Sequence, residues 1–250
     1  MLKIEGLAGL LLLVTLSPGP RSFAQANVVK PASPDVRFRV GRLLYSDDFR
    51  HGLANWTAEE EKAGKVEASH GVLDIDVPAG LTLWFRHKLQ GPIIITYKAT
   101  VIAAGGPNDD VTDLNCFWMA TDPAHPNDIL AGHRSGKFSD YNDLLTYYVG
   151  VGGRGNKTTR FRRYIGSKTV RPLRPQDDLS PGNLIVPNRT VTIQLVADGP
   201  LIQYYLNGGK LFEMVDPHPY TSGWFAIRTV HNHMRIQDLR IFRLLPAASR

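Results

Sequence analysis

Cysteine is almost absent from this chain: Cys116 is the one cysteine among 250 residues. The chain therefore cannot form an internal disulfide, and its fold must be held by an apolar core. Cys116 lies in the apolar run Leu-Asn-Cys-Phe-Trp-Met-Ala, where a buried structural thiol is expected. A catalytic cysteine would need a histidine partner, and the sequence does not place one beside it.

Long apolar runs are missing after residue 26, so the sequence predicts no membrane span. The first 26 residues have the pattern of a secretory signal peptide. Lys3 precedes an apolar stretch at residues 6–16, which is shorter than the roughly 20 residues of a spanning helix, and Ala24-Gln25-Ala26 is a small-x-small cleavage site. Since an exported chain without disulfides fits a bacterial periplasm or exterior, we expect a periplasmic or extracellular bacterial protein.

An apolar pattern with helical period is also missing after the signal sequence. Many short β-rich runs, separated by turn-forming residues, are present instead and indicate a sandwich or barrel. No internal repeat is visible, which disfavours a propeller or solenoid. We therefore predict an all-β chain with a flexible leader at residues 27–40 and a single β-sandwich domain at residues 41–246.

A hairpin is predicted in the middle of the chain, where β-rich runs at residues 144–151 and 158–165 flank a glycine-rich join at residues 152–156. Because side chains alternate between the faces of a strand, one face should carry either Tyr147 or Tyr148 together with arginines. Tyrosine rings beside guanidinium groups suit an acidic sugar. The alternative is that the tyrosines are core residues and the arginines form a solvated sheet edge.

Charge is distributed unevenly along the chain. From Arg154 to Pro175 there are eight basic residues and no acidic residue. Such a run favours an anionic partner, and an acidic polysaccharide is our first interpretation, with a solvated basic face as the alternative. Nucleic acid is a poorer fit, because the chain is expected to be exported and has no recognisable nucleic-acid-binding motif.

The C-terminal third has a specific pattern: Tyr-Tyr-Leu-Asn-Gly-Gly-Lys, then Gly-Trp-Phe-Ala-Ile-Arg, then Met-Arg-Ile-Gln-Asp-Leu-Arg-Ile-Phe-Arg. Over residues 190–245 it resembles the end of a concanavalin A-like (laminin G-like) jelly roll. The runs Leu-Asn-Cys-Phe-Trp-Met-Ala-Thr-Asp-Pro and Tyr-Tyr-Val-Gly-Val-Gly-Gly resemble an uncharacterised family of exported bacterial domains in that superfamily. The resemblance implies a jelly-roll β-sandwich of two antiparallel sheets and a carbohydrate ligand.

The same superfamily includes lectins, glucanases and polysaccharide lyases, so the resemblance leaves the chemistry open. The Glu-x-Asp-x-x-Glu strand of its glucanases is not found in this sequence. Retaining glycoside hydrolysis needs two facing carboxylates about 5 Å apart, and a hydrolase is therefore our third hypothesis. The first is a polysaccharide lyase acting on a uronic-acid-containing glycan, and the second is a non-catalytic carbohydrate-binding module.

A lyase must neutralise the substrate carboxylate, remove the neighbouring proton and protonate the leaving oxygen. We predict Tyr147 or Tyr148 as base or acid, with His133 as its partner. Arg134 and Asn115 are predicted to neutralise the carboxylate, a role that Arg162 or Arg228 could also fill. Further ligand contacts are predicted at Trp118, Arg160, Arg162, Trp224, Arg228, His231 and His233.

Strand alternation relates several of these candidates. If Phe225 and Ile227 face the core, Trp224 and Arg228 line the concave sheet. Asn115 alternates with its neighbours, so its direction depends on which nearby aromatic residue is buried.

Two clusters could hold a metal. His231 and His233 should share a face at a strand end, although no third ligand is evident. The acidic loop with Asp109, Asp110 and Asp113 could bind a structural Ca²⁺, and polar turn chemistry explains it equally well. The predicted chemistry requires no cofactor, and the sequence makes no prediction of oligomeric state.

Overall fold

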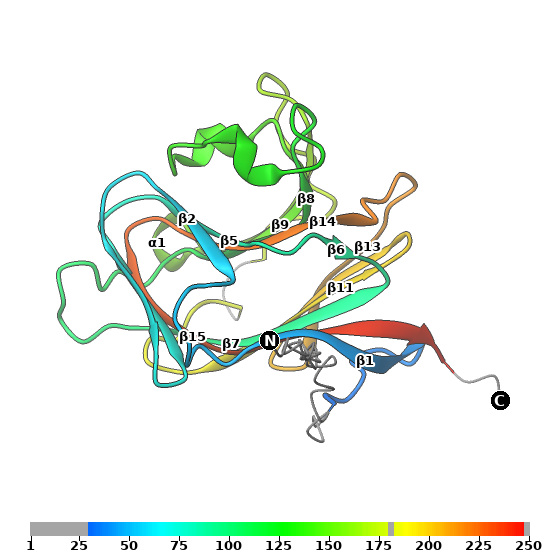
Figure 1. The fold of residues 1–250 in the computed structure, drawn as a ribbon, viewed down its shortest axis with the longest axis horizontal. Coiled ribbons are helices and arrows are strands. Elements are labelled where there is room, and N and C mark those ends of the chain that lie inside the picture. Colours follow the sequence, from blue (N-terminus) through cyan, green and yellow to red (C-terminus); the bar gives the residue numbers. More distant parts are fainter. Residues whose placement is uncertain (1–29, 180–182, 248–250) are drawn as a thin grey trace, which may run out of the picture. The chain divides into compact units, whose positions relative to one another are not determined.

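The computed structural model describes residues 30–179 and 183–247, which form two antiparallel sheets facing one another (Figure 1). The predicted signal peptide lies outside the described residues. The first strand begins at Phe38, inside the segment predicted as a leader. No helix among the described residues is long and apolar enough to cross a membrane.

The larger sheet has eight strands in the order β13-β12-β11-β7-β15-β4-β3, with β1 paired to β15. Its strands are β1 (Phe38–Asp47), β3 (Lys65–Ser69), β4 (Val72–Val77), β7 (Ile93–Val101), β11 (Val191–Asp198), β12 (Leu201–Leu206), β13 (Gly209–Val215) and β15 (Asn232–Pro246). The β-branched run of β7 lies between β11 and β15, as expected for a central strand.

The second sheet has seven strands in the order β10-β9-β8-β14-β5-β2, with β6 paired to β14. Its strands are β2 (Trp56–Glu60), β5 (Leu81–Phe85), β6 (Leu89–Gln90), β8 (Leu114–Thr121), β9 (Leu145–Gly152), β10 (Thr158–Ile165) and β14 (Ser222–Thr229). The helical segments are short: η1 (Ile129–Gly132), η2 (Phe138–Tyr141) and α1 (Gly153–Asn156). The prediction of an all-β sandwich of two antiparallel sheets is confirmed.

The main core lies between the two sheets, because each strand turns alternate apolar residues toward the opposite sheet. On β8 these residues are Cys116 and Trp118, and on β14 they are Phe225 and Ile227. Burial raises the pKa of the Cys116 thiol to about 12, so the thiol stays protonated and unreactive at neutral pH. The prediction of a buried structural cysteine is confirmed.

Part of the outer face of the seven-stranded sheet is apolar as well. Residues 122–144, which we call the cap, cover part of this face and carry η1 and η2 (Figure 1). The cap contributes Ile129, Tyr141 and Leu144 to a second buried cluster. The sheet contributes Trp84, Phe117, Ala120, Tyr148, Tyr164, Trp224 and Ala226 to the same cluster.

A substitution of Trp118 tests how much the core between the sheets contributes to stability. Its ring stacks on Phe161 at 6.0 Å and contacts Tyr147, and 1% of the residue is exposed. Trp118→Ala should lower the free energy of unfolding by roughly 3–5 kcal/mol, because it removes a large buried side chain and leaves a cavity. Urea unfolding followed by far-UV circular dichroism measures this change.

Val36→Ala is the control, because Val36 is 91% exposed and its truncation should change stability by less than about 0.5 kcal/mol. Equal stability of the two variants would contradict the placement of Trp118 in the core.

Candidate functional site

The predicted hairpin is present as β9 and β10, which pair from Leu145 with Ile165 to Gly150 with Arg160. The connection carries positive φ angles at Gly152, Arg154, Gly155 and Asn156. At Gly152 a side chain is also excluded by space, since a Cβ there would lie 2.4 Å from the Ile185 side chain. The turn therefore fixes the position of Arg154 at the end of the hairpin.

Strand register arranges the outward-facing residues of the seven-stranded sheet in rows. One row is mostly polar and consists of directly paired Glu59, Thr82, Arg228, Asn115, Gly150 and Arg160. The next row has an aromatic centre and consists of Thr57, Trp84, Ala226, Phe117, Tyr148 and Arg162. Both rows end at an arginine of β10, so the basic edge of the sheet adjoins an aromatic surface.

The cap closes the far end of these rows. Glu59 accepts hydrogen bonds from Trp84 Nε1 at 2.8 Å and from Tyr141 Oη at 2.9 Å. Arg228 is buried, donates to the Gly136 carbonyl, and lies under the ring of Phe138. Burial lowers the pKa of Arg228 below its ordinary value. Glu59 and Arg228 are therefore used inside the protein and are not free to meet a ligand.

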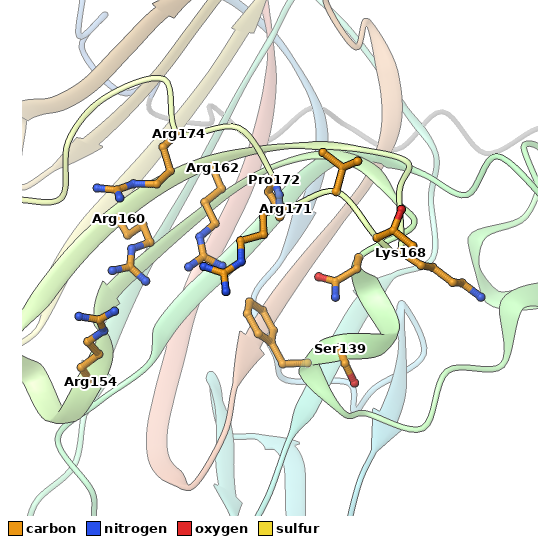
Figure 2. A pocket seen from close by; sticks show the side chains of 12 residues that line it. Ser139, Arg154, Arg160, Arg162, Lys168, Arg171, Pro172 and Arg174 are labelled. Atoms are coloured by element: carbon orange, nitrogen blue, oxygen red, sulfur yellow. The ribbon is translucent and has the colours of Figure 1, made fainter.

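The uncovered part of the outer face, near β10, holds a cavity of about 500 Å³ (Figure 2). Arg160 and Arg162 reach it from β10, and Arg171 reaches it from the segment that follows β10. A smaller recess of about 130 Å³ adjoins it and is lined by Asp113, Tyr148 and Gly150 among others. We call the cavity and recess together the arginine pocket; its basic residues are Arg154, Arg160, Arg162, Lys168, Arg171 and Arg174.

The outer wall of the arginine pocket is tied to β10 by backbone hydrogen bonds. Leu173 exchanges two hydrogen bonds with Arg163, and Leu179 exchanges two with Thr159. Residues 166–179 therefore lie along β10 as an irregular edge. This arrangement brings Lys168, Arg171 and Arg174 beside the arginines of the hairpin.

Only some of these cations are neutralised by carboxylates. Arg160 binds both oxygens of Asp178, and this pairing holds the Asp178 pKa below its usual value. Arg174 lies 3.4 Å from the same carboxylate, and Lys168 lies 3.4 Å from Asp143. In the described ranges, Arg154, Arg162 and Arg171 have no carboxylate oxygen within 4.0 Å. These three guanidinium groups are not directly paired with a carboxylate, so the lining of the cavity carries an excess of positive charge.

Tyr148 lines the recess of the arginine pocket, and Asn115 is buried beside Asp113, which also lines it. Tyr148 faces outward beside Arg162, its partner on β10, and burial raises the Tyr148 pKa well above its ordinary value. Asn115 donates from Nδ2 to Asp113 Oδ1 at 3.2 Å and is 2% exposed. The predicted grouping of one tyrosine with the arginines on one face is thus present, and the tyrosine is Tyr148.

Tyr147 and Trp118 face the opposite way, into the core between the sheets. Tyr147 Oη donates to Asp216 at 2.7 Å and accepts from the Tyr220 amide at 3.0 Å. Burial raises the Tyr147 pKa above its ordinary value. These positions are incompatible with the predicted roles of Tyr147 as base or acid and of Trp118 as a ligand contact, because strand alternation turns both side chains away from the outer face.

The cap residues among the candidates have structural positions. Arg134 forms a buried ion pair with Asp122 at 2.6 Å and donates to the Ile129 and Asp140 carbonyls. His133 is exposed after η1 and does not line the arginine pocket. Arg134 therefore links separate parts of the cap to one another. The predicted pairing of His133 with a tyrosine of the pocket is not found.

Trp224 faces outward, as alternation with the buried Phe225 predicted. The residue is nevertheless only 4% exposed, and its ring lies under Lys88 Nζ at 4.9 Å. Trp224 and the similarly oriented Arg228 are therefore on the expected face, but surrounding residues cover both.

The histidine and aspartate candidates mostly lie elsewhere. His233 is the second residue of β15 in the eight-stranded sheet, where its ring contacts Asp109 at 2.8 Å and Asp74 at 3.1 Å. His231 lies 3.9 Å from Asp110, and neither histidine lines the arginine pocket.

The predicted calcium loop is held by internal hydrogen bonds. Asp109 accepts from the Ala104 and Gly106 amides as well as from His233, and these bonds lower its pKa to about 2. Asp113 is separate from that cluster and lies in the arginine pocket. The part of the chain that the structure describes contains no group of three or more His, Cys, Asp or Glu side chains placed to hold a metal.

Four residues of the arginine pocket were missed as individual candidates: Arg154, Lys168, Arg171 and Arg174. The run of eight basic residues was the signal that could have found them. Sequence alone does not show that residues 166–179 fold back along β10, and this return places the later residues of the run beside the earlier ones.

Solved structures with similar folds define the class as a galectin-like β-sandwich. A Bacillus subtilis protein of unknown function with a galectin-like fold has a TM-score of 0.65 at 17% identity, covering 84% of this chain and 99% of that chain. Carbohydrate-binding module CBM66 from Bacillus subtilis has a TM-score of 0.52 at 9% identity, covering 76% and 96%. An endo-β-1,3-glucanase from Pyrococcus furiosus has a TM-score of 0.57 at 10% identity, covering 82% and 95%.

Residues 75–239 match the family described as Domain of unknown function (DUF6250), and the chain belongs to this family. No curated protein sequence matches the chain. The predicted resemblance to an uncharacterised family with a concanavalin A-like jelly roll is confirmed.

The Arg134–Asp122 ion pair allows a test of the cap. Burial would raise the Asp122 pKa, but hydrogen bonds from His125, the Ala124 amide and Arg134 outweigh it and lower that pKa. Asp122→Asn should lower the free energy of unfolding by roughly 3 kcal/mol at neutral pH, because it leaves Arg134 buried without its closest anionic partner. Urea unfolding measures this loss.

The stability lost in Asp122→Asn should decrease as the pH falls. Since the folded-state pKa of Asp122 is lowered, its contribution is complete above roughly pH 4 and is lost as pH falls through the folded-state value. Asp122→Asn should lack this part of the acid dependence. Asp177→Asn is the control, because Asp177 is fully exposed; an equal effect of both substitutions would contradict the structural role of the pair.

Proposed function

We propose that this domain binds an acidic polysaccharide in the arginine pocket. The observation that carries the proposal is the group of Arg154, Arg162 and Arg171 around one open cavity, none of which has a carboxylate oxygen of the described residues within 4.0 Å. Guanidinium groups bind carboxylates through paired, charge-assisted hydrogen bonds. Such a group can therefore hold acidic substituents of a glycan.

The class of ligand is supported by the similar folds. Their names include a carbohydrate-binding module and an endo-β-1,3-glucanase, so this architecture accommodates carbohydrate ligands in other proteins. In addition, the N-terminal sequence has the pattern of an export signal, which would bring the domain to compartments where polysaccharides are found. The acidic character of the proposed ligand rests on the arginines alone.

Glycoside hydrolysis is less well supported. Either mechanism of hydrolysis uses two carboxyl groups on opposite sides of the bond, roughly 5–9.5 Å apart. Of the described residues that line the arginine pocket, Asp113 alone is acidic. Glu59 lies under the cap and already accepts hydrogen bonds from buried donors.

A polysaccharide lyase is the second candidate function, favoured by Tyr148 and Asp113 in one recess. The raised pKa of Tyr148 keeps its hydroxyl protonated, so Tyr148 can give a proton to the leaving oxygen. Asp113 can accept the proton from the carbon next to the substrate carboxylate. The C–O bond then breaks as the carbon–carbon double bond forms, while Arg162 would stabilise the developing charge.

The binding proposal predicts that each free arginine contributes separately. Arg162→Gln and Arg154→Gln should each weaken binding by about 10-fold, equivalent to about 1.4 kcal/mol, because each removes a charged donor. Affinity gels and calorimetry with polygalacturonate, alginate and hyaluronan measure this, with neutral dextran as the comparison polymer.

Arg39→Gln is the matched control, since Arg39 is exposed on β1 in the other sheet. Binding of the wild type should weaken with added salt, as expected for charged contacts. Retention of none of the acidic polymers, or an equal loss in Arg39→Gln, would overturn the proposed site.

The lyase hypothesis has its own test. Wild-type protein incubated with the same polymers should generate the ultraviolet absorbance of an unsaturated uronate, and Tyr148→Phe should reduce that rate by at least about 100-fold. Binding by Tyr148→Phe should fall by much less, because the arginines are unchanged. If no polymer gives an absorbance increase with the wild type, elimination on these substrates is wrong, and the binding function remains.

A further inference from the structure

The arginine pocket is lined by apolar side chains as well as by cations. Phe138, Val170 and Pro172 line the cavity (Figure 2), and Phe138 also lines the adjoining recess. Phe138 is the first residue of η2 in the cap and packs against the buried cluster of the outer face. A ligand made only of charged groups would leave this apolar surface unused. The lining therefore suits a ligand that carries apolar surface beside its acidic group.

One face of the Phe138 ring is held by the protein. The guanidinium carbon of Arg228 lies over this ring, 5.4 Å from its centroid, and Arg228 is 1% exposed. The Tyr148 ring contacts Phe138 as well, with 5.5 Å between the ring centroids. Phe138 is nevertheless only half-buried, and it lines both parts of the pocket. Because the face over Arg228 is covered, the ring offers its other face and its edges to the pocket.

Arg228 also fixes the backbone beside this ring. Its Nη1 donates to Thr82 Oγ1 and to the Gly136 carbonyl, and Gly136 lies two residues before Phe138. The same guanidinium therefore holds the cap backbone by a hydrogen bond and the ring by a cation–π contact. The ring is in place before a ligand arrives, and a preorganised group loses less entropy on binding.

A sugar ring matches such an aromatic surface. The faces of a pyranose carry C–H groups, whose slightly positive hydrogens are attracted to the negative face of an aromatic ring. Arg162 is the cross-strand partner of Tyr148, which contacts Phe138. The aromatic surface and a guanidinium without a close carboxylate therefore adjoin the same tyrosine. A uronic acid stacked on Phe138 would have a cation near for its carboxylate.

We propose that Phe138 is a stacking platform for a sugar ring in the arginine pocket. The ligand class that follows is a glycan of uronic acids, whose rings supply the apolar face, in preference to a polyanion that has no sugar ring. This inference rests on the proposed binding function and adds a specificity to it: the arginines bind the acid, and Phe138 selects the ring.

The test compares polygalacturonate, alginate and hyaluronan with polyglutamate, a carboxylated polymer without sugar rings, at equal concentrations of carboxylate. Wild-type protein should bind at least one of the three glycans about 10-fold more tightly than polyglutamate, because only a glycan can stack on Phe138. Phe138→Leu keeps an apolar side chain and loses the aromatic face. It should weaken binding of that glycan by about 10-fold and leave binding of polyglutamate unchanged. Calorimetry measures both affinities.

Leu130→Ala is the matched control. Leu130 is also a partly buried cap residue packed against the same apolar cluster, but it lines neither part of the arginine pocket. Its affinities should equal those of the wild type. Phe138→Tyr is the second variant, because it keeps the aromatic ring, and it should retain the preference for the glycan. Circular dichroism and urea unfolding check that each variant is folded.

The outcomes separate the platform from the binding function. If the wild type binds polyglutamate as tightly as every glycan while Arg162→Gln weakens all of them, the platform is wrong and binding of acidic glycans stands. A preference for the glycan that persists in folded Phe138→Leu, or an equal loss in Leu130→Ala, would also overturn the platform. If the wild type binds none of the acidic glycans, the proposed function fails, and the platform fails with it.

Discussion

The structure depends on one constraint: the seven-stranded sheet carries large apolar side chains on both faces, and these must be covered on both. Its inner face packs on the eight-stranded sheet, while its outer face presents Trp84, Phe117 and Trp224. Leaving such large rings in water would cost roughly 1.5–3 kcal/mol for each side chain, so part of the chain must fold over them. The cap does this, and its position decides where a ligand can reach the sheet.

The cap is fastened by polar contacts that would be costly if left incomplete. Glu59 under the cap accepts from Trp84 and Tyr141, and Arg134 within the cap pairs with Asp122. Each of these groups has its partner in the closed cap, so removing one partner would leave a buried polar or charged group unsatisfied. The outer face is consequently divided into a covered aromatic half and an open basic half at β10.

The basic residues of the open half also fall into two groups, those near a carboxylate and those that face the cavity. Asp178 neutralises Arg160 and lies near Arg174. The Asp178–Arg160 pair helps hold residues 166–179 against β10. Arg162 and Arg171 have no carboxylate this close among the described residues, and they face the cavity. The same basic run therefore supplies both the wall of the pocket and the charges that the wall encloses.

Local sequence was sufficient to predict the β9–β10 hairpin and the alternation of side chains along its strands. The glycine-rich join at residues 152–156 predicted the β9–β10 hairpin, and alternation predicted that one of two adjacent tyrosines would share a face with the arginines. Alternation alone could not say which tyrosine, since Tyr147 and Tyr148 are both aromatic and both faces of this sheet carry buried apolar residues. The same ambiguity placed Trp118 among the candidates for ligand binding.

What the sequence by itself determined is the all-β architecture, the hairpin, the buried cysteine and the basic run, because each depends on neighbours along the chain. Tertiary structure alone decided that the cap covers Arg228, that Trp224 lies under Lys88, and that His233 belongs to the other sheet. It also made Arg134 a structural residue of the cap. It also paired Gly150 on β9 with Asn115 on β8 and packed Tyr148 Oη and Asn115 Oδ1 against Gly150. Register and cap packing are contacts between distant segments, and no local pattern specifies them.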